Sequence, residues 1–181
     1  MNIDEIYVSA CRGAFDRNVY DVRLIDWLEN VRPQIPLNDY AKKQLPAIMP
    51  HGLFLSRKQD TFQKHSGLIQ VDIDAKHQKG GFKPEAILQD MECEHPIAAC
   101  GLSCSGSGIY ALVAVDFDNA KQDAVGVHVD VADQVREWVE MIFPVKCDWP
   151  VMGNLSSLRF ASPYAPYVNF QVEPIKYERN R

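Results

Sequence analysis

The sequence predicts an α+β protein: a ferredoxin-like β-α-β-β-α-β sheet, also called RRM-like or palm-like, with an N-terminal α/β extension. Residues 67–74 are predicted as a strand, because apolar and polar side chains alternate from Ile69 to Asp74. Residues 97–102 and 109–115 are short apolar runs bounded by polar or small residues, and these also indicate strands. Residues 131–143 carry apolar side chains at helical spacing. The elements follow one another in the order of that fold.

The N-terminal extension is expected to span residues 1–65 and to pack on the palm-like part, residues 66–181, as one compact unit. Residues 21–31 place their apolar side chains on one helical face, and prolines soon afterwards end that helix. A short strand is expected at 53–55.

Three further elements are predicted in the palm-like part: a helix, a turn and a short fourth strand. Residues 84–91 form a predicted helix with proline in its first turn, and residues 103–108 form a turn rich in serine and glycine. Residues 145–147 are predicted as a short fourth strand. In this topology the first strand lies between the third and the fourth. Asp148, at the end of the fourth strand, should therefore lie near the end of the first.

Composition excludes several classes of protein. The hydrophobic fraction of 46% and the charged fraction of 24% are ordinary for a globular domain. No apolar run approaches the roughly 20 residues that span a bilayer, so no membrane partner is expected. The acidic start does not resemble a signal peptide, and the five cysteines form no Cys-x-x-Cys motif, so a cytoplasmic location is expected. The net charge of −5 argues against nonspecific coating of nucleic acid.

The candidate metal ligands are Asp72 and Asp74, which alternate with Val71 and Ile73. Residues two apart on a strand share a face, so the two carboxylates lie side by side and repel each other. A divalent cation, Mg²⁺ or Mn²⁺, removes that repulsion. With Asp148 as a third carboxylate, the set suits metal-dependent phosphoryl transfer. The alternative is an edge strand with a solvated polar face.

Two further features are suited to phosphate. The turn at 103–108 offers exposed backbone amides, although it lacks the lysine of a P-loop. Arg159 can donate two parallel hydrogen bonds to a phosphate, although a surface salt bridge is the alternative role. A zinc site is a weaker alternative, because its candidate ligands have loose spacing: Cys93, His95, Cys100 and Cys104. His65 and His77 are expected to be solvated or structural.

The order of these blocks resembles the VirE N-terminal-like domain of the archaeo-eukaryotic primase, or primase-polymerase, superfamily. The resemblance covers roughly residues 5–175. It rests on the following blocks: Leu45-Pro46-Ala47, His65-Ser66-Gly67-Leu68-Ile69 before Asp72-Ile73-Asp74, Ser105-Gly106-Ser107-Gly108, Asp148, and Leu158-Arg159-Phe160-Ala161-Ser162.

The resemblance implies a nucleotidyltransferase that adds nucleotides on a nucleic-acid template during DNA replication. Asp72, Asp74 and Asp148 would be its catalytic metal ligands. The expected partners are nucleoside triphosphates, a nucleic acid, for which DNA is expected, and a helicase or another replication protein. The residues that would bind the nucleotide are Ser105, Gly106, Ser107, Gly108, Tyr110 and Arg159.

The sequence departs from the family pattern at two positions. Tyr110 stands where active members usually have a histidine, and Ser157 stands where an arginine is frequent. A neutral phenol does not replace a cationic imidazole. The alternative function is therefore a catalytically impaired module that binds nucleic acid or nucleotide for a replication partner. A metal-dependent nuclease is a third possibility, since carboxylate clusters also serve hydrolysis.

Overall fold

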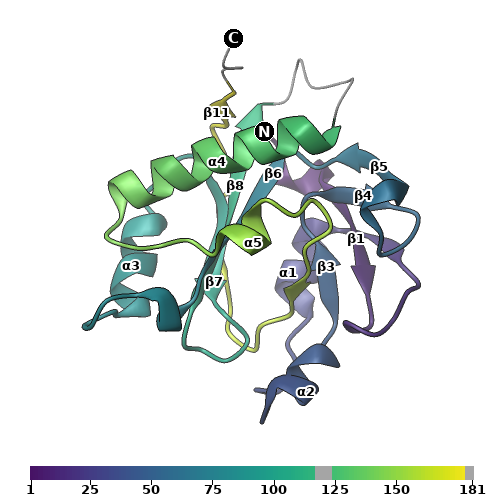
Figure 1. Cartoon of the computed structure of the whole chain (residues 1–181), viewed down its shortest axis with the longest axis horizontal. Coiled ribbons are helices and arrows are strands. Elements are labelled where there is room, and N and C mark those ends of the chain that lie inside the picture. Colours follow the sequence, from purple (N-terminus) through teal and green to yellow (C-terminus); the bar gives the residue numbers. More distant parts are fainter. Residues whose placement is uncertain (117–123, 178–181) are drawn as a thin grey trace.

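The computed structural model describes residues 1–116 and 124–177 of an α+β chain (Figure 1). Its centre is an antiparallel sheet in which β8 (Ile109–Asp116) pairs with β6 (Leu68–Ile73) on one side and with β7 (Ile97–Leu102) on the other. The predicted strands at these three places are therefore present. Their apolar runs form strands because both faces of the sheet are covered by the rest of the chain.

Three helices cover one face of the central sheet: α3 (Pro84–Met91), α4 (Ala124–Ile142) and the short α5 (Trp149–Met152). Figure 1 shows α4 lying across this face. The odd-numbered residues of β6 point to the helices. They join a buried apolar cluster that includes Ile69, Val71, Ile73, Ile109, Val113, Val131, Val135 and Val139.

The even-numbered residues of β6 face the N-terminal part. Leu68 packs with Leu112 of β8 and with Leu24 and Leu28 of α1 (Leu24–Asn30) in a second buried cluster. Asp72 belongs to this even-numbered set. Its side chain therefore leaves the sheet on the face opposite the three helices.

A second sheet, with the strand order β2-β1-β3-β9, ties the two predicted parts of the chain together. Ile48 of β3 pairs with Arg159 of β9, which comes from far later in the sequence. The strands of this sheet are β1 (Tyr7–Cys11), β2 (Tyr20–Arg23), β3 (Ala47–Met49) and β9 (Arg159–Phe160).

The remaining elements are short. A hairpin joins β4 to β5, β10 pairs with β7, and β11 runs parallel to the end of β8. Their bounds, with those of the small helices, are β4 (Gly52–Phe54), β5 (Phe62–His65), β10 (Tyr167–Val168), β11 (Ile175–Lys176), α2 (Asp39–Lys43), η1 (Ile3–Glu5), η2 (Gln59–Thr61) and η3 (Ala75–His77).

The predicted fourth strand at 145–147 is wrong. Asp148 donates its backbone N–H to the carbonyl of Asp72 at 2.8 Å, but the two preceding N–H groups bond to side chains instead of a strand. The ferredoxin-like arrangement is therefore not completed on this edge of β6. The helix predicted at 21–31 begins only at Leu24, because Tyr20–Arg23 pairs with β1. No helix in the described ranges is long and apolar enough to cross a membrane.

Candidate functional site

The end of β6 brings three metal-ligating side chains together. Asp74 follows the strand directly, and the 3₁₀ turn η3 then bends the chain so that the N–H of His77 donates to the Asp74 carbonyl at 3.0 Å. Asp148 arrives from the other side as the residue before α5. One ligand atom from each of Asp74, His77 and Asp148 lies within 4.8 Å of the other two. The group is partly exposed, so a cation can reach it.

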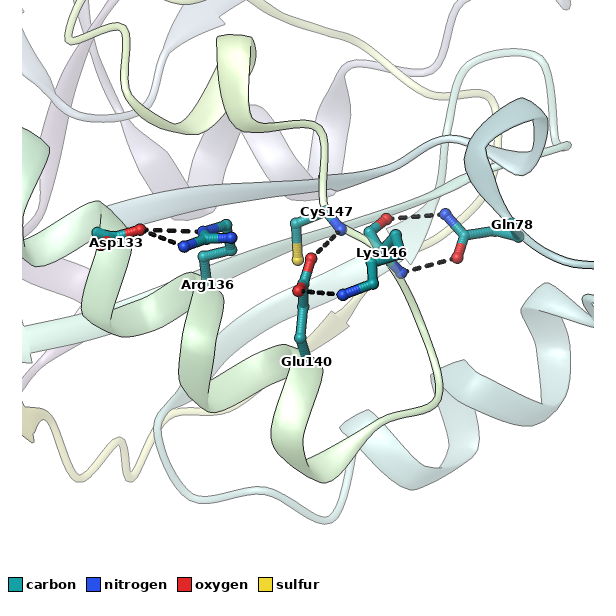
Figure 2. Close-up of polar contacts among 6 residues, drawn as sticks. All are labelled: Gln78, Asp133, Arg136, Glu140, Lys146 and Cys147. Atoms are coloured by element: carbon teal, nitrogen blue, oxygen red, sulfur yellow. Dashed lines mark hydrogen bonds and ion pairs between the residues drawn. The ribbon is translucent and has the colours of Figure 1, made fainter.

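Asp148 is held at this place by its one backbone bond to Asp72 and by side chains that fix the two residues before it, and not by a strand. Gln78 spans the gap to Lys146: its Nε2 donates to the Lys146 carbonyl and its Oε1 accepts from the Lys146 N–H, both at 2.8 Å (Figure 2). Glu140 of α4 accepts the N–H of Cys147 at 3.0 Å and contacts Lys146 Nζ at 2.7 Å. These contacts fix the two residues that precede Asp148 without a sheet ladder.

Asp72 lies in the electrostatic field of the same cluster but is not one of the three clustered ligands. Burial raises the pKa of its carboxyl, and the negative charges of Asp74 and Asp148 raise it further. Arg159 and Lys42 act in the opposite direction and lower it. The carboxyl of Asp72 therefore sits between an acidic group on one side and a basic group on the other.

The basic group beside Asp72 is Arg159, which stacks on the ring of Tyr110. Asp72 is paired with Tyr110 in the sheet register, and the guanidinium carbon of Arg159 lies 3.5 Å from the centroid of the Tyr110 ring. Such a stack is a favourable cation–π contact. Arg159 is 6% exposed, and its Nε has no hydrogen-bond partner among the described residues. Burial raises the pKa of the Tyr110 hydroxyl, while Arg159 opposes the rise. The phenol is therefore neutral.

The serine- and glycine-rich turn touches the same end of β6. A Cβ at Gly108 would lie 2.8 Å from the carbonyl oxygen of Ile73 and 3.6 Å from the Cα of Asp74, so only glycine permits this approach. The hydroxyls of Ser105 and Ser107 lie 2.9 Å apart and exposed. Gly106 has φ +76°, a left-handed conformation that glycine adopts without strain. The turn thus lies beside Asp74.

The sequence-based candidates fall into two groups. Asp74 and Asp148 come together, with Asp72, Tyr110 and Arg159 adjoining them on the face away from the helices. The sequence analysis missed His77, for which the signal is its position three residues after Asp74 on a tight turn, and it missed Gln78 and Lys42. The alternative zinc ligands do not gather in the described structure: Cys93 and His95 are exposed, whereas Cys100 and Cys104 are buried.

Three other histidines form a separate cluster, in which His51 and His128 are buried and His65 is half-buried. The ring of His128 lies with its centroid 4.3 Å from that of His51 and 5.5 Å from that of His65. The N–H of Gly67 donates to His65 Nδ1, so His65 Nε2 carries the proton and donates to His128 Nδ1 at 3.3 Å. His128 Nε2 then donates to the carbonyl of Met152 at 2.9 Å.

His51 completes the cluster with both ring nitrogens in use. Its Nε2 accepts the N–H of Gln70 at 3.0 Å, and its Nδ1 donates to the carbonyl of Leu155 at 3.1 Å. Burial lowers the pKa of all three imidazoles, to about 3 for His65 and about 4 for His128, and well below the usual value for His51. The three rings are neutral and fully bonded, so they are structural.

The comparison with protein-family models identifies the family of the chain. A model described as the BT4734-like, N-terminal domain matches residues 40–151, more than half of the 181 residues. The chain therefore belongs to that family. The predicted membership of the VirE N-terminal-like, primase-polymerase group is wrong, because the family that matches is a different one. No curated protein and no solved structure matches the chain. The matched range contains Asp72, Asp74, His77 and Asp148 and ends before Arg159.

Proposed function

We propose that this domain binds Mg²⁺ or Mn²⁺ at Asp74, His77 and Asp148, and that the bound metal serves nucleotidyl transfer to a nucleic-acid end. The observation that carries the proposal is the convergence of these three side chains within 4.8 Å. Carboxylate oxygens are the preferred ligands of both cations. An imidazole nitrogen is a softer donor, so the mixed set suits Mn²⁺ at least as well as Mg²⁺.

The surroundings of the metal ligands fit a nucleoside triphosphate as substrate. A divalent cation neutralises phosphate oxygens and activates an attacking hydroxyl, which is the main catalytic need of phosphoryl transfer. Arg159, with its unpartnered Nε, and Lys42 supply positive charge beside Asp72. The 105–108 turn adds small, exposed groups next to Asp74. Together these features support a phosphate site beside a metal site.

The proposal also covers the role of the fold, as a palm-like support for the site. The central sheet with α3 and α4 serves as a palm-like platform, and a nucleic-acid template, with DNA as the expected type, would approach the end of β6 on the face opposite the helices. A helicase or another replication protein is the proposed partner. The sheet supports this reading through the register of β6, β8 and β7, which places Asp72 and Tyr110 side by side on that face.

A second function, binding without turnover, is favoured by one observation. Tyr110 is 3% exposed and packed against Arg159, so the residue paired with Asp72 in the sheet is a neutral phenol and not a cationic imidazole. Asp74 is also paired with Lys76 at 2.6 Å, which partly neutralises it. The domain would then hold a metal–nucleotide complex or a nucleic acid for a partner enzyme.

A primer-extension assay with Mn²⁺ tests the proposal. The wild type should extend a labelled primer on a DNA template, and Asp74→Ala and Asp148→Ala should abolish extension. Asp60→Asn, an exposed carboxylate on η2, is the matched control and should retain activity. Mn²⁺ titration followed by electron paramagnetic resonance gives a readout that does not need turnover.

The outcomes separate the functions. Mn²⁺ and nucleotide binding without extension would favour the binding module, and degradation of the labelled DNA by metal alone would favour a nuclease. If Mn²⁺ binds the wild type and both alanine variants equally, the metal site is wrong.

A further inference from the structure

A cavity of about 650 Å³ lies beside the metal ligands but opens between other elements. It is bounded by the segment after η3, the first turns of α3 and the chain that follows α4. Its volume lies within the range of small-molecule sites. None of Asp74, His77 and Asp148 lines it, so it is a separate place from the metal centre.

The floor of the cavity is apolar. Phe82 and Ile87 line it, and both also pack against the buried cluster under the helices. Pro144 and Val145, which follow α4, and Ala86 of α3 add further apolar lining. A half-buried phenylalanine anchored in this way offers a fixed aromatic surface, on which a flat ring stacks favourably.

The rim of the cavity is cationic. Lys79, Lys83 and Lys146 line it, with Glu140 as the acidic residue among the lining side chains. Glu140 is already paired with Lys146 at 2.7 Å and accepts the N–H of Cys147 (Figure 2). Lys79 and Lys83 are exposed and have no ion pair with any residue that the structure describes. Two positive charges thus remain uncompensated in a chain whose net charge is −5.

The polar wall of the cavity is formed before any ligand arrives. The side-chain amide of Gln78 is committed to both backbone groups of Lys146, and its Nε2 also donates to the carbonyl of Asp74 at 3.0 Å. A ligand therefore need not order this wall, which lowers the entropic cost of binding. The wall has no uncompensated negative charge that would repel an anion.

We propose that this cavity binds a small anion with a flat, apolar ring system, of the size of a nucleoside monophosphate. The ring would lie on Phe82 and Ile87, and the anionic group would meet Lys79 and Lys83. This goes beyond the proposed function, because the site needs neither the metal nor turnover.

The test uses 8-anilinonaphthalene-1-sulfonate, an aromatic anion whose fluorescence rises on binding, titrated into the whole chain without metal. Saturable binding is expected, and AMP should displace the probe, whereas adenosine and inorganic phosphate should be at least tenfold weaker. The double variant Lys79→Gln/Lys83→Gln should weaken probe and AMP binding about tenfold, since two exposed charge pairs are lost. Lys58→Gln, another exposed lysine, is the control and should bind as the wild type does.

A second variant tests the cavity itself. Ala86 is exposed on α3, so Ala86→Glu fills the opening with a bulky negative charge without touching the core, and it should abolish binding. Gln89→Glu, exposed on the same helix outside the lining residues, should not. Unchanged affinity in the lysine and Ala86 variants, or failure of AMP to displace the probe, overturns the proposal. Because no metal is present, this result is independent of the primer-extension assay.

Discussion

Two groups of ionisable side chains lie at the two ends of α5, Asp148 preceding its first residue and His128 bonding to its last, and they differ in how their polar atoms are satisfied. At the end of β6, two carboxylates and an imidazole gather with their ligand atoms close together, and among the described residues Lys76 is the one ion-pair partner of the three. In the histidine cluster, every ring nitrogen of His51, His65 and His128 has a partner. Fully hydrogen-bonded groups stabilise a fold. Like charges close to one another destabilise it, and a bound cation removes that repulsion. This difference separates a structural cluster from a candidate site.

The largest expected effect is the loss of folding stability when the pH is lowered, which follows from the histidine cluster. A buried imidazole with a lowered pKa is neutral in the folded chain, while the unfolded chain takes up a proton below pH 6.5. Stability is therefore fully present above about pH 6.5 and falls as the pH drops toward the folded pKa values, about 3 for His65 and about 4 for His128. The free energy of unfolding in urea should fall by on the order of 5 kcal/mol between pH 7.5 and 4.5.

His65→Gln provides the control for that titration. Removing one imidazole should reduce the pH slope by about one proton between pH 6 and 5. A wild-type free energy of unfolding that stays flat over this window would contradict the assignment of neutral histidines.

The next effect tests the bonds of the histidine cluster. His51→Phe keeps the ring volume but leaves the N–H of Gln70 and the carbonyl of Leu155 buried without partners. Each such group costs about 1–3 kcal/mol, so unfolding at pH 7.5 should show a loss of about 3 kcal/mol. His95→Phe, at an exposed histidine, should change stability by less than about 0.5 kcal/mol. Equal effects of the two substitutions would remove the contrast between a bonded cluster and a surface.

The acidic cluster should respond in the opposite direction. Asp148→Asn removes one like charge, and the Asp148 side chain makes no capping hydrogen bond to α5 that the substitution would break. Stability without metal should therefore stay equal or rise by up to about 1 kcal/mol. Mn²⁺ at one hundred times its dissociation constant should stabilise the wild type by about 2.7 kcal/mol and this variant much less. Thermal unfolding with and without Mn²⁺ measures both, and equal Mn²⁺ stabilisation of the two proteins would argue against the site.

The smallest effect concerns Lys76. Its ammonium lies 2.6 Å from Asp74 but is well exposed, so the pair contributes little to stability. Lys76→Gln should leave the free energy of unfolding within about 0.5 kcal/mol of the wild type. It should raise Mn²⁺ affinity a few-fold, because a competing cation is gone. Calorimetric titration checks this, and weaker Mn²⁺ binding would mean that Lys76 supports the site.

Local patterns predicted the elements whose contacts are themselves local or strongly apolar. The helix at 84–91 and the strand at 97–102 have the predicted bounds, because proline at a first turn and an apolar run act within a few residues. The strand predicted at 145–147 failed because Gln78 and Glu140 take up the backbone groups that a ladder would use. Neither partner is visible from the segment itself.

The residues of the candidate site were likewise predicted only in part from the sequence. The alternation around Asp72 and Asp74 predicted a strand with two carboxylates near its end, and the structure has Asp72 in β6 and Asp74 directly after it. His77 was missed because its role depends on a 3₁₀ turn that returns it to Asp74. The histidine cluster was also invisible, since its members come from β5, α4 and the turn before β4. No spacing in the sequence relates them.

The sequence by itself determined the α+β class, the central strands and helices, and the presence of two aspartates at the end of β6. Hydrophobic periodicity and turn residues act over short stretches of chain, so neighbouring residues in the sequence determine these features. Only the tertiary structure decided which ionisable groups are bonded and which are left facing one another. That choice depends on partners far apart in sequence, such as Gln78 with Lys146 and His51 with Leu155. Burial then fixes their charge, because desolvation acts only once the fold has closed around them.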